Sequence, residues 1–172
     1  MTVRNAFLLF FLVVAIERII STFVRKEPAG EIMYKWLTIM LISTYTIGSF
    51  IGPIQFYING IEPKMVFSVA GFIMFFLAIA LRKSAMKMLG PNWSVQTRLI
   101  AGQRLIKTGP YKYLKHPYYA AVMLEMTGVA LIFNSIAAVI FTYLIHLPFL
   151  LIRIHLEEKL LISQFGEEYS KY

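Results

Sequence analysis

The sequence predicts an all-α integral membrane protein with five transmembrane helices. Its composition is the first reason: 58% of the 172 residues are hydrophobic, whereas soluble domains are typically about 45–50% apolar. The excess is concentrated in five long apolar runs, each close to the ~20 residues that a transmembrane helix needs. These runs lack the strand-like alternation needed to close a β-barrel, so helices are expected. The length suits a single membrane domain covering residues 1–172.

The five expected spans cover residues 6–24, 33–57, 65–81, 117–133 and 135–152. The first contains Glu17 and Arg18 and lacks a small-residue cleavage site, so we expect a retained span and not a signal peptide. Asn134 and Ser135 leave almost no loop between the last two spans, which predicts a tight helical hairpin.

The tail after the fifth span, RIHLEEKLLISQFGEEYSKY, is expected to continue as a helix. Its apolar positions suit an amphipathic helix that leaves the fifth span and lies against the bundle; they are Ile154, Leu156, Leu160, Leu161, Ile162 and Phe165. Gly166 is the expected stop signal.

The basic residues predict the orientation of the chain. With five spans, one side receives only Arg4 and Lys64. The other side receives Arg25, Lys26, Lys35, Arg82, Lys83, Lys87, Arg98, Arg104, Lys107, Lys112, Lys115, Arg153, Lys159 and Lys171. Because cytoplasmic loops carry the excess of Lys and Arg, the long loop and the C-terminus are expected in the cytoplasm and the N-terminus outside.

Composition also restricts the chemistry. The chain has no cysteine, which excludes disulfides, thiolate metal sites and cysteine nucleophiles. It has no aspartate, so all nine acidic residues are glutamates. The net charge of +8 is best explained by basic loops that meet anionic membrane lipid, and a nucleic-acid partner is not expected.

The segment GPYKYLKHPYYAAVMLE, residues 109–125, combines turn, basic and aromatic residues at the mouth of the fourth span. His116-Pro117 is expected to start a helix, because proline at the first helical position gives up no needed hydrogen bond. The free N–H groups of that start, with Lys115 and His116 beside them, attract an anion. The tyrosines at 111, 113, 118 and 119 suit a flat ring. The alternative is an interfacial aromatic belt with positive-inside lysines.

Charged residues follow the fifth span directly. Arg153 and Glu157 are four residues apart and share a helix face, and Glu158 follows. Alone, these residues would be a surface ion pair and a solvated acid. They come at the cytoplasmic end of the helix that forms a hairpin with the Pro117 helix, so we expect the two motifs to be neighbours.

Here the sequence resembles the isoprenylcysteine carboxyl methyltransferase family, in particular its small prokaryotic members. GPYKYLKHPYYAA resembles the family signature G-x-Y-x-x-x-R-H-P-x-Y-x-G, and the tail resembles R-x-x-x-E-E-x-x-L followed by F-G-x-E-Y-x-x-Y. LGPNWSVQTRLIAGQRLIKTG fits the preceding loop, so the resemblance covers residues 70 to 172. Two departures are Lys115 in place of the signature Arg, which loses the bidentate fork, and Ala121 in place of Gly.

The resemblance implies an enzyme, an S-adenosylmethionine-dependent O-methyltransferase embedded in the membrane. Its catalytic region would be residues 90–172, where the loop and the C-terminal helix form the cofactor site. Arg153 and Glu157 would be the catalytic residues, Arg153 facing the substrate and Glu157 holding an amino or hydroxyl group of the cofactor. The implied cofactor contacts are Gln96, Gln103, Arg104, Leu105, Ile106, Tyr111, His116, Pro117, Tyr118, Tyr119 and Glu157.

The acceptor would be lipophilic, either an isoprenylcysteine-type carboxylate or a small lipid-like acid, enol or phenol. A carboxylate is ionised at neutral pH and needs no base, so Arg153 would act by orienting it. A phenol or enol needs its oxygen deprotonated, which Arg153 or His155 would assist. Two rival functions stay open: a membrane NADPH-dependent sterol-type reductase, and a small transporter built around Glu17, Arg18 and Glu125.

Three further residues are candidates outside the motifs. Glu125 lies within the fourth span, where a carboxylate is a functional hypothesis by default, and we expect it to pair with Arg18 or a tyrosine hydroxyl. His146 either lines a substrate tunnel or satisfies the backbone that Pro148 frees. A metal site is not expected, because the spacings of His116, His146, His155 and Glu157 match no ligand motif.

Overall fold

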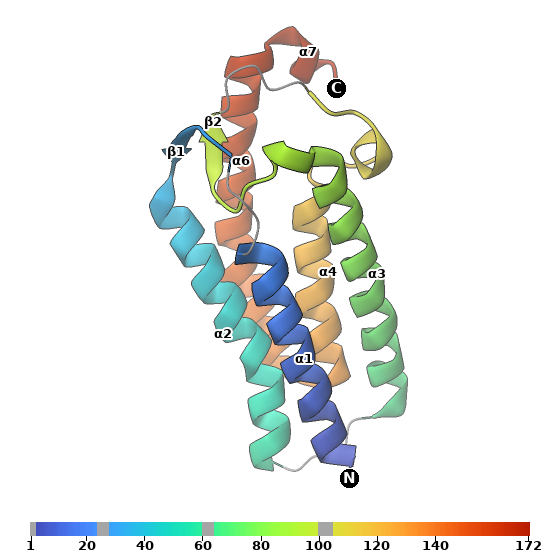
Figure 1. The fold of residues 1–172 in the computed structure, drawn as a ribbon. Coiled ribbons are helices and arrows are strands. Elements are labelled where there is room, and N and C mark those ends of the chain that lie inside the picture. Colours follow the sequence, from blue (N-terminus) through green and yellow to red (C-terminus); the bar gives the residue numbers. More distant parts are fainter. Residues whose placement is uncertain (1–2, 24–27, 60–63, 100–104) are drawn as a thin grey trace.

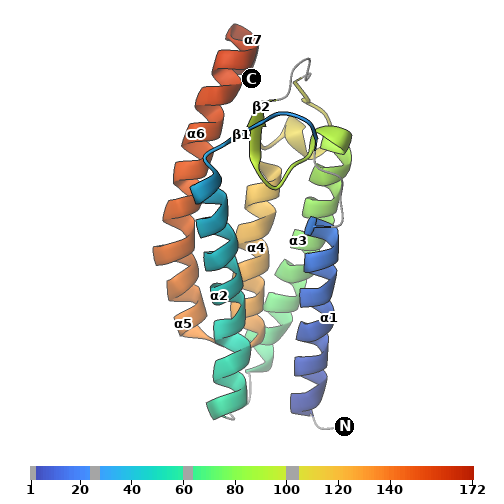
Figure 2. The same ribbon diagram turned by 60° about the vertical axis from the view of Figure 1, so that its left-hand side comes forward.

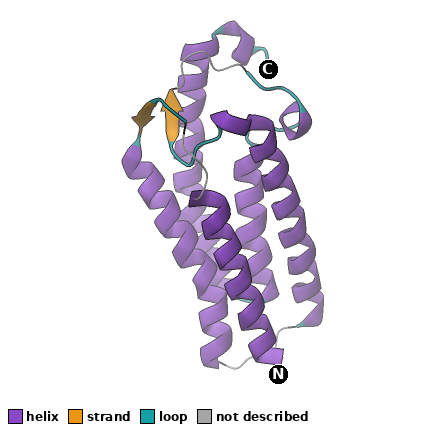
Figure 3. Cartoon of the chain, in the orientation of Figure 1, coloured by secondary structure: helices purple, strands orange, loops and turns teal. Residues whose placement is uncertain are grey.

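The protein is a bundle of long antiparallel helices with a small irregular cap at one end (Figures 1 and 3). The computed structural model describes residues 3–23, 28–59, 64–99 and 105–172. The elements are α1 (Val3–Phe23), β1 (Glu31–Met33), α2 (Lys35–Asn59), α3 (Met65–Leu89), η1 (Gly90–Asn92), β2 (Thr97–Leu99), η2 (Gly109–Lys112), α4 (Pro117–Ile132), α5 (Ile136–Phe141), η3 (Thr142–His146), α6 (Leu147–Phe165) and α7 (Glu167–Ser170).

The described part of the chain has four helical segments long and apolar enough to cross a membrane, which are Asn5–Thr22, Lys35–Asn59, Met65–Asn92 and Ile136–Phe165. α4 is shorter, with 16 residues, and is the most enclosed helix, since ten of those residues are buried. A helix surrounded by others needs no polar face. The start of α1 and the C-terminus lie at opposite ends of the bundle (Figures 1 and 2). We call the end with the C-terminus the upper end.

α3 and α4 pack along each other more extensively than any other pair of elements. Two glycines face each other at their crossing: a Cβ on Gly71 would lie 2.6 Å from the backbone oxygen of Gly128 and 2.6 Å from the nitrogen of Ile132. Small residues let membrane helices approach this closely. The pair therefore fixes α4 against α3 and positions the start of α4 at the upper end.

The predicted hairpin between the last two spans is present. Asn134 takes a positive φ of 52°, which asparagine tolerates better than most residues. The Ser135 side chain accepts a hydrogen bond from the Ala138 backbone N–H at 3.0 Å and so caps α5. The chain turns within three residues, from Phe133 to Ser135, and α5 returns beside α4.

The fifth span and the tail form one continuous helical rod with a π-turn inside it. α5 passes through η3, the π segment, into α6, which continues to Phe165 and rises above the other long helices (Figures 1 and 2). Pro148 lies two residues after the end of the π segment, and proline frees a carbonyl group one turn earlier. Gly166 ends the rod with a φ of 56° and an N–H bonded to Ile162 O at 2.8 Å, as predicted.

Two parts of the upper end differ from the all-α prediction. β1 and β2 pair antiparallel, with Ile32 opposite Arg98. Strands of three residues are too short to show periodicity, so their pairing depends on contacts far apart in sequence. The third span is also longer than predicted, because Arg82, Lys83 and Lys87 continue α3 and do not belong to a loop.

Candidate functional site

A cavity of about 340 Å³ begins among the loops at the upper end and extends between the helices. Its upper part is lined by Trp93, Gln96, Leu105, Ile106, Tyr111, His116, Tyr118, Tyr119, Arg153, Glu157, Phe165, Tyr169 and Tyr172. Its lower part, within the bundle, is lined by Phe11, Arg18, Leu41, Tyr45, Val122, Glu125, Val129, His146 and Leu150. The upper part is aromatic and polar, whereas the lower part mixes apolar side chains with a few buried polar ones.

Arg153 joins three elements at the boundary between these parts. Its Nε donates to the Tyr119 hydroxyl at 2.8 Å, and its Nη1 donates to Thr38 Oγ1 at 3.1 Å. Its Nη2 donates to the backbone oxygen of Val95 at 2.6 Å. A guanidinium has five N–H donors. Three of these N–H donors are used in hydrogen bonds to described residues, so two N–H donors remain for a ligand oxygen.

Glu157 lies one turn further along α6, on the same face of the helix. It accepts a hydrogen bond from the Tyr119 hydroxyl, and its Oε2 is 4.0 Å from Arg153 Nε. The Tyr119 hydroxyl therefore stands between the guanidinium and the carboxylate. The predicted proximity of the two motifs is present, and one tyrosine connects them.

The start of α4 forms the adjacent wall. Pro117 occupies the first turn of the helix, as predicted. The His116 ring stacks on Tyr119, with centroids 5.6 Å apart, and its Nε2 is 3.3 Å from Glu158 Oε1. A helix start, a histidine and the nearby Lys115 make this wall favourable for an anionic group.

The C-terminal tail closes the upper end. The Tyr172 hydroxyl donates to the backbone oxygen of Tyr111, and Lys107 Nζ is 3.2 Å from Glu168 Oε1. Burial raises the pKa of the Tyr111 phenol above its ordinary value, and the Glu157 carboxylate adds to the shift. Burial also raises the pKa of Tyr169. These phenols therefore stay protonated and can donate hydrogen bonds.

The structure brings together most of the residues that the sequence singled out. Nine of them line the cavity: Gln96, Leu105, Ile106, Tyr111, His116, Tyr118, Tyr119, Arg153 and Glu157. Pro117 is buried at the start of α4 and shapes the wall through the backbone. Gln103 and Arg104 lie outside the described residues.

The upper part of the cavity suits a ligand with an aromatic ring, an ammonium or hydroxyl group and a carboxylate. Gln96 contributes a direct indication, because its buried Oε1 has no hydrogen-bond partner among the described residues. A buried acceptor of this kind needs a donor, such as the amino group of an adenine. The described residues contain no group of three or more His, Asp or Glu side chains arranged to hold a metal ion.

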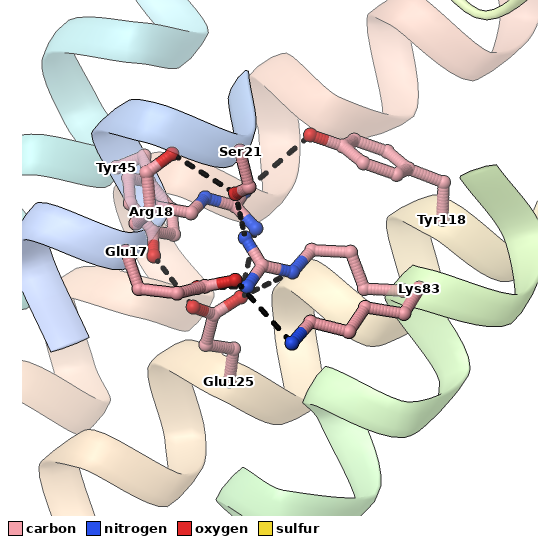
Figure 4. Close-up of polar contacts among 8 residues, drawn as sticks. Glu17, Arg18, Ser21, Tyr45, Lys83, Tyr118 and Glu125 are labelled. Carbon is pink, nitrogen blue, oxygen red and sulfur yellow. Dashed lines mark hydrogen bonds and ion pairs between the residues drawn. The ribbon is translucent and has the colours of Figure 1, made fainter. Parts of the chain in front are cut away.

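A buried charged cluster lies beside the lower part of the cavity (Figure 4). Arg18 Nη1 is 2.9 Å from Glu125 Oε2, and the Tyr45 hydroxyl donates to Glu125 Oε1 at 3.1 Å. Arg82 Nη2 is 2.7 Å from Glu17 Oε2, while its Nε is 3.9 Å from Glu125. The expected pairing of Glu125 with Arg18 and a tyrosine hydroxyl is thus present. The cluster explains why α3 can carry Arg82 inside the bundle, since its charge is paired.

Sequence reasoning missed two of the three residues that hold the Arg153 guanidinium in place. Thr38 lies in an apolar run with no motif, and Val95 lies in the family-like loop but contributes only its backbone carbonyl, so nothing local predicts their approach to Arg153. The role of Arg82 was missed for another reason, since it was placed in a loop. The unusual Glu17-Arg18 pair within an apolar run was the available signal that a buried counter-charge must exist elsewhere.

The match to a known protein family covers the start of α4, Arg153 and Glu157. The model of the isoprenylcysteine carboxyl methyltransferase (ICMT) family matches residues 70–163, more than half of the chain. A protein-S-isoprenylcysteine O-methyltransferase from Schizosaccharomyces pombe is 30% identical over 123 residues, covering 69% of this chain and 50% of that protein. The uncharacterized protein YpbQ of Bacillus subtilis is 34% identical over 82 residues, covering 48% of this chain and 46% of that protein.

A solved structure of a eukaryotic intramembrane Ras methyltransferase, ICMT, has the same fold. The TM-score is 0.63 at 24% identity, covering 82% of this chain and 50% of that one. The chain spans about half the length of the curated relatives it matches. The prediction of a helical, multi-pass membrane protein of this family is confirmed.

Proposed function

Because this chain belongs to the isoprenylcysteine carboxyl methyltransferase family, we propose that it transfers a methyl group from S-adenosylmethionine to an oxygen of a lipophilic acceptor. The observation that carries the proposal is the two-part cavity. Its upper part offers aromatic faces, the Glu157 carboxylate and the basic start of α4. Its lower part is largely apolar and lies within the bundle.

The cofactor would occupy the upper part. Its carboxylate suits the start of α4 beside His116 and Lys115, and its amino group or ribose suits Glu157. The adenine suits the aromatic side chains, with Gln96 Oε1 accepting from its amino group. When bound, S-adenosylmethionine supplies an electrophilic methyl group on a sulfonium, which passes to the acceptor oxygen and leaves a neutral thioether.

Arg153 would orient the acceptor oxygen. It lies where the upper part of the cavity meets the lower part, and Tyr119, Thr38 and Val95 hold its guanidinium in place. A fixed guanidinium with donors to spare contributes by positioning the reacting oxygen. The Tyr172–Tyr111 contact and the aromatic residues of the cap would limit the access of water to this point.

In the membrane, α1, α2, α3, α4 and the α5–α6 rod would form five spans. The short α4 is surrounded by longer helices, so it crosses without meeting much lipid. The excess of Lys and Arg at the upper end supports a cytoplasmic cap, C-terminus and cofactor site. A reporter fused after Tyr172 should be cytoplasmic and one at the N-terminus external. An external C-terminal reporter would separate the site from cytosolic cofactor and contradict the proposal.

Calorimetric titration of the purified protein tests the cofactor. We expect saturable binding of S-adenosylmethionine and none of NADPH, the cofactor of a sterol-type reductase. His116→Ala and Tyr119→Ala should each weaken binding while the thermal unfolding transition stays cooperative. Binding of NADPH alone would favour a reductase, and binding of neither would favour a non-enzymatic role. Unchanged affinity in both variants would remove the α4 start from the site.

A further inference from the structure

His146 presents a buried nitrogen with no partner to the lower part of the cavity. The residue is 1% exposed and ends the π segment η3. Its Nδ1 lies 2.8 Å from Thr44 Oγ1, whereas its Nε2 has no hydrogen-bond partner among the described residues. Single π-turns occur often at functional sites. The imidazole bonds to a side chain of α2 and not to the backbone that Pro148 frees. Of its two expected roles, this leaves the first, because His146 lines the cavity.

The bond to Thr44 determines which nitrogen carries the proton. Thr44 Oγ1 lies 2.8 Å from the backbone oxygen of Met40, four residues earlier, and a threonine in a helix commonly donates to that carbonyl. A hydroxyl has only one proton to give. With that proton directed to Met40, Thr44 accepts from Nδ1–H of His146. Nε2 then holds a lone pair, an assignment that follows from the hydrogen-bond network.

No neighbouring donor satisfies Nε2 among the described residues. Tyr45, whose ring centroid is 6.4 Å from that of His146, donates its hydroxyl proton to Glu125. Arg18 lies over the Tyr45 ring, with its guanidinium carbon 4.6 Å from the ring centroid, and its Nη1 binds Glu125. Nε2 is therefore an acceptor in an enclosed place, and a hydrocarbon chain beside it would leave it unsatisfied.

We propose that His146 Nε2 accepts a hydrogen bond from a hydroxyl group on the body of the methyl acceptor. The acceptor is then a lipophilic molecule with an O–H within the bilayer, and not one whose buried portion is a plain prenyl chain. This inference rests on the proposed function and names its substrate class. His146 and Arg153 are seven residues apart on one helix, about 10 Å along its axis. The hydroxyl would thus anchor the acceptor below the point where its reacting oxygen meets Arg153.

A matched pair of probes tests the hydrogen bond. We would measure dissociation constants of 4-nonylphenol and of 4-nonyltoluene, in which a methyl group replaces the hydroxyl, without cofactor and in one detergent. The wild-type protein should prefer the phenol roughly tenfold, about 1.4 kcal/mol. His146→Phe should bind both probes alike, whereas His146→Gln should keep the preference because its amide oxygen can accept. Partitioning into micelles is common to all proteins and cancels in the comparison.

The controls separate this inference from the proposed function. Should His146→Phe fail to unfold cooperatively, His146→Leu replaces it. The inference would be overturned if the wild-type protein bound both probes equally. It would also be overturned if the His146→Phe or His146→Leu protein, which has no acceptor at this position, still preferred the phenol. S-adenosylmethionine is titrated into the same samples. Normal cofactor binding without a phenol preference would overturn the inference alone, whereas absent cofactor binding in the wild-type protein would count against the methyltransferase.

Discussion

Replacing Tyr119 with phenylalanine tests the link between the two charged residues of the site. The change removes one oxygen and keeps the ring that stacks on His116. That oxygen accepts from Arg153 Nε at 2.8 Å and donates to Glu157. Tyr119→Phe therefore deprives both charged side chains of a partner without opening a large cavity.

The magnitude follows from the geometry. Hydrogen bonds to charged groups contribute about 1.5–3 kcal/mol each, and two are lost. Arg153 Nε and Glu157 Oε2 are already 4.0 Å apart, so they can close into a direct pair that replaces one of them. The direct pair draws Glu157 away from the cofactor, and its partial exposure to solvent favours the lower end of the range. A loss of about 1.4 kcal/mol corresponds to a roughly tenfold weaker affinity for S-adenosylmethionine.

The assay is calorimetric titration of S-adenosylmethionine into wild-type protein, Tyr119→Phe and the neighbouring Tyr118→Phe. The Tyr118 hydroxyl lies 3.5 Å from Arg18 Nη2 and bonds neither Arg153 nor Glu157, so its loss should change the affinity far less. Thermal unfolding of all three proteins checks that they are folded. An affinity of Tyr119→Phe within about twofold of wild type would refute the reasoning, as would an equal loss in both variants.

Four further substitutions are expected to act by different routes. Arg153→Ala should leave cofactor affinity nearly intact and slow single-turnover methyl transfer on the order of a hundredfold. Glu157→Ala should instead weaken cofactor binding by about 1.5–3 kcal/mol. If both variants lose the same cofactor affinity and the same rate, and the double variant is no worse, the two residues act as one structural pair. Glu125→Ala should lower the free energy of unfolding by about 3–5 kcal/mol, because Arg18 loses its carboxylate partner within the bundle while Arg82 keeps only Glu17. A loss below about 1 kcal/mol in a denaturation titration would contradict this. Gly71→Ala should cost about 1–3 kcal/mol by forcing α3 from α4, while Ala80→Val on the exposed face of α3 serves as the control that should unfold at the wild-type temperature.

The sequence was sufficient to predict what depends on local pattern. Apolar runs placed the long helices, Pro117 and Gly166 marked a helix start and a helix end, and Asn134-Ser135 marked the hairpin. Glu125 inside a span indicated a buried counter-charge, which is Arg18. These features are readable because each is decided by a few adjacent residues or by the cost of burying a charge.

What the sequence left open depends on contacts between distant segments. β1 and β2 are three residues each, so no periodicity announces them, and they form only because the upper ends of α2 and α3 bring them together. Arg82 follows an apolar run and resembles a loop residue until its partner Glu17, 65 positions away, is known. The free Nε2 of His146 depends on a bond to Thr44, 102 positions away, which no local pattern contains.

The two parts of the cavity wall differ in how much of their lining lies within the stretch shared with the family. The cap and α6, which surround the upper part, lie mostly within residues 70–163, the stretch shared with the family. Phe11, Arg18, Leu41 and Tyr45, which line the lower part, come from α1 and α2, outside that stretch. Substitutions in the first two helices can therefore reshape the lower chamber while the residues around Glu157 stay as they are. The fold thus allows part of the lower wall to be altered from helices that do not carry Arg153 or Glu157.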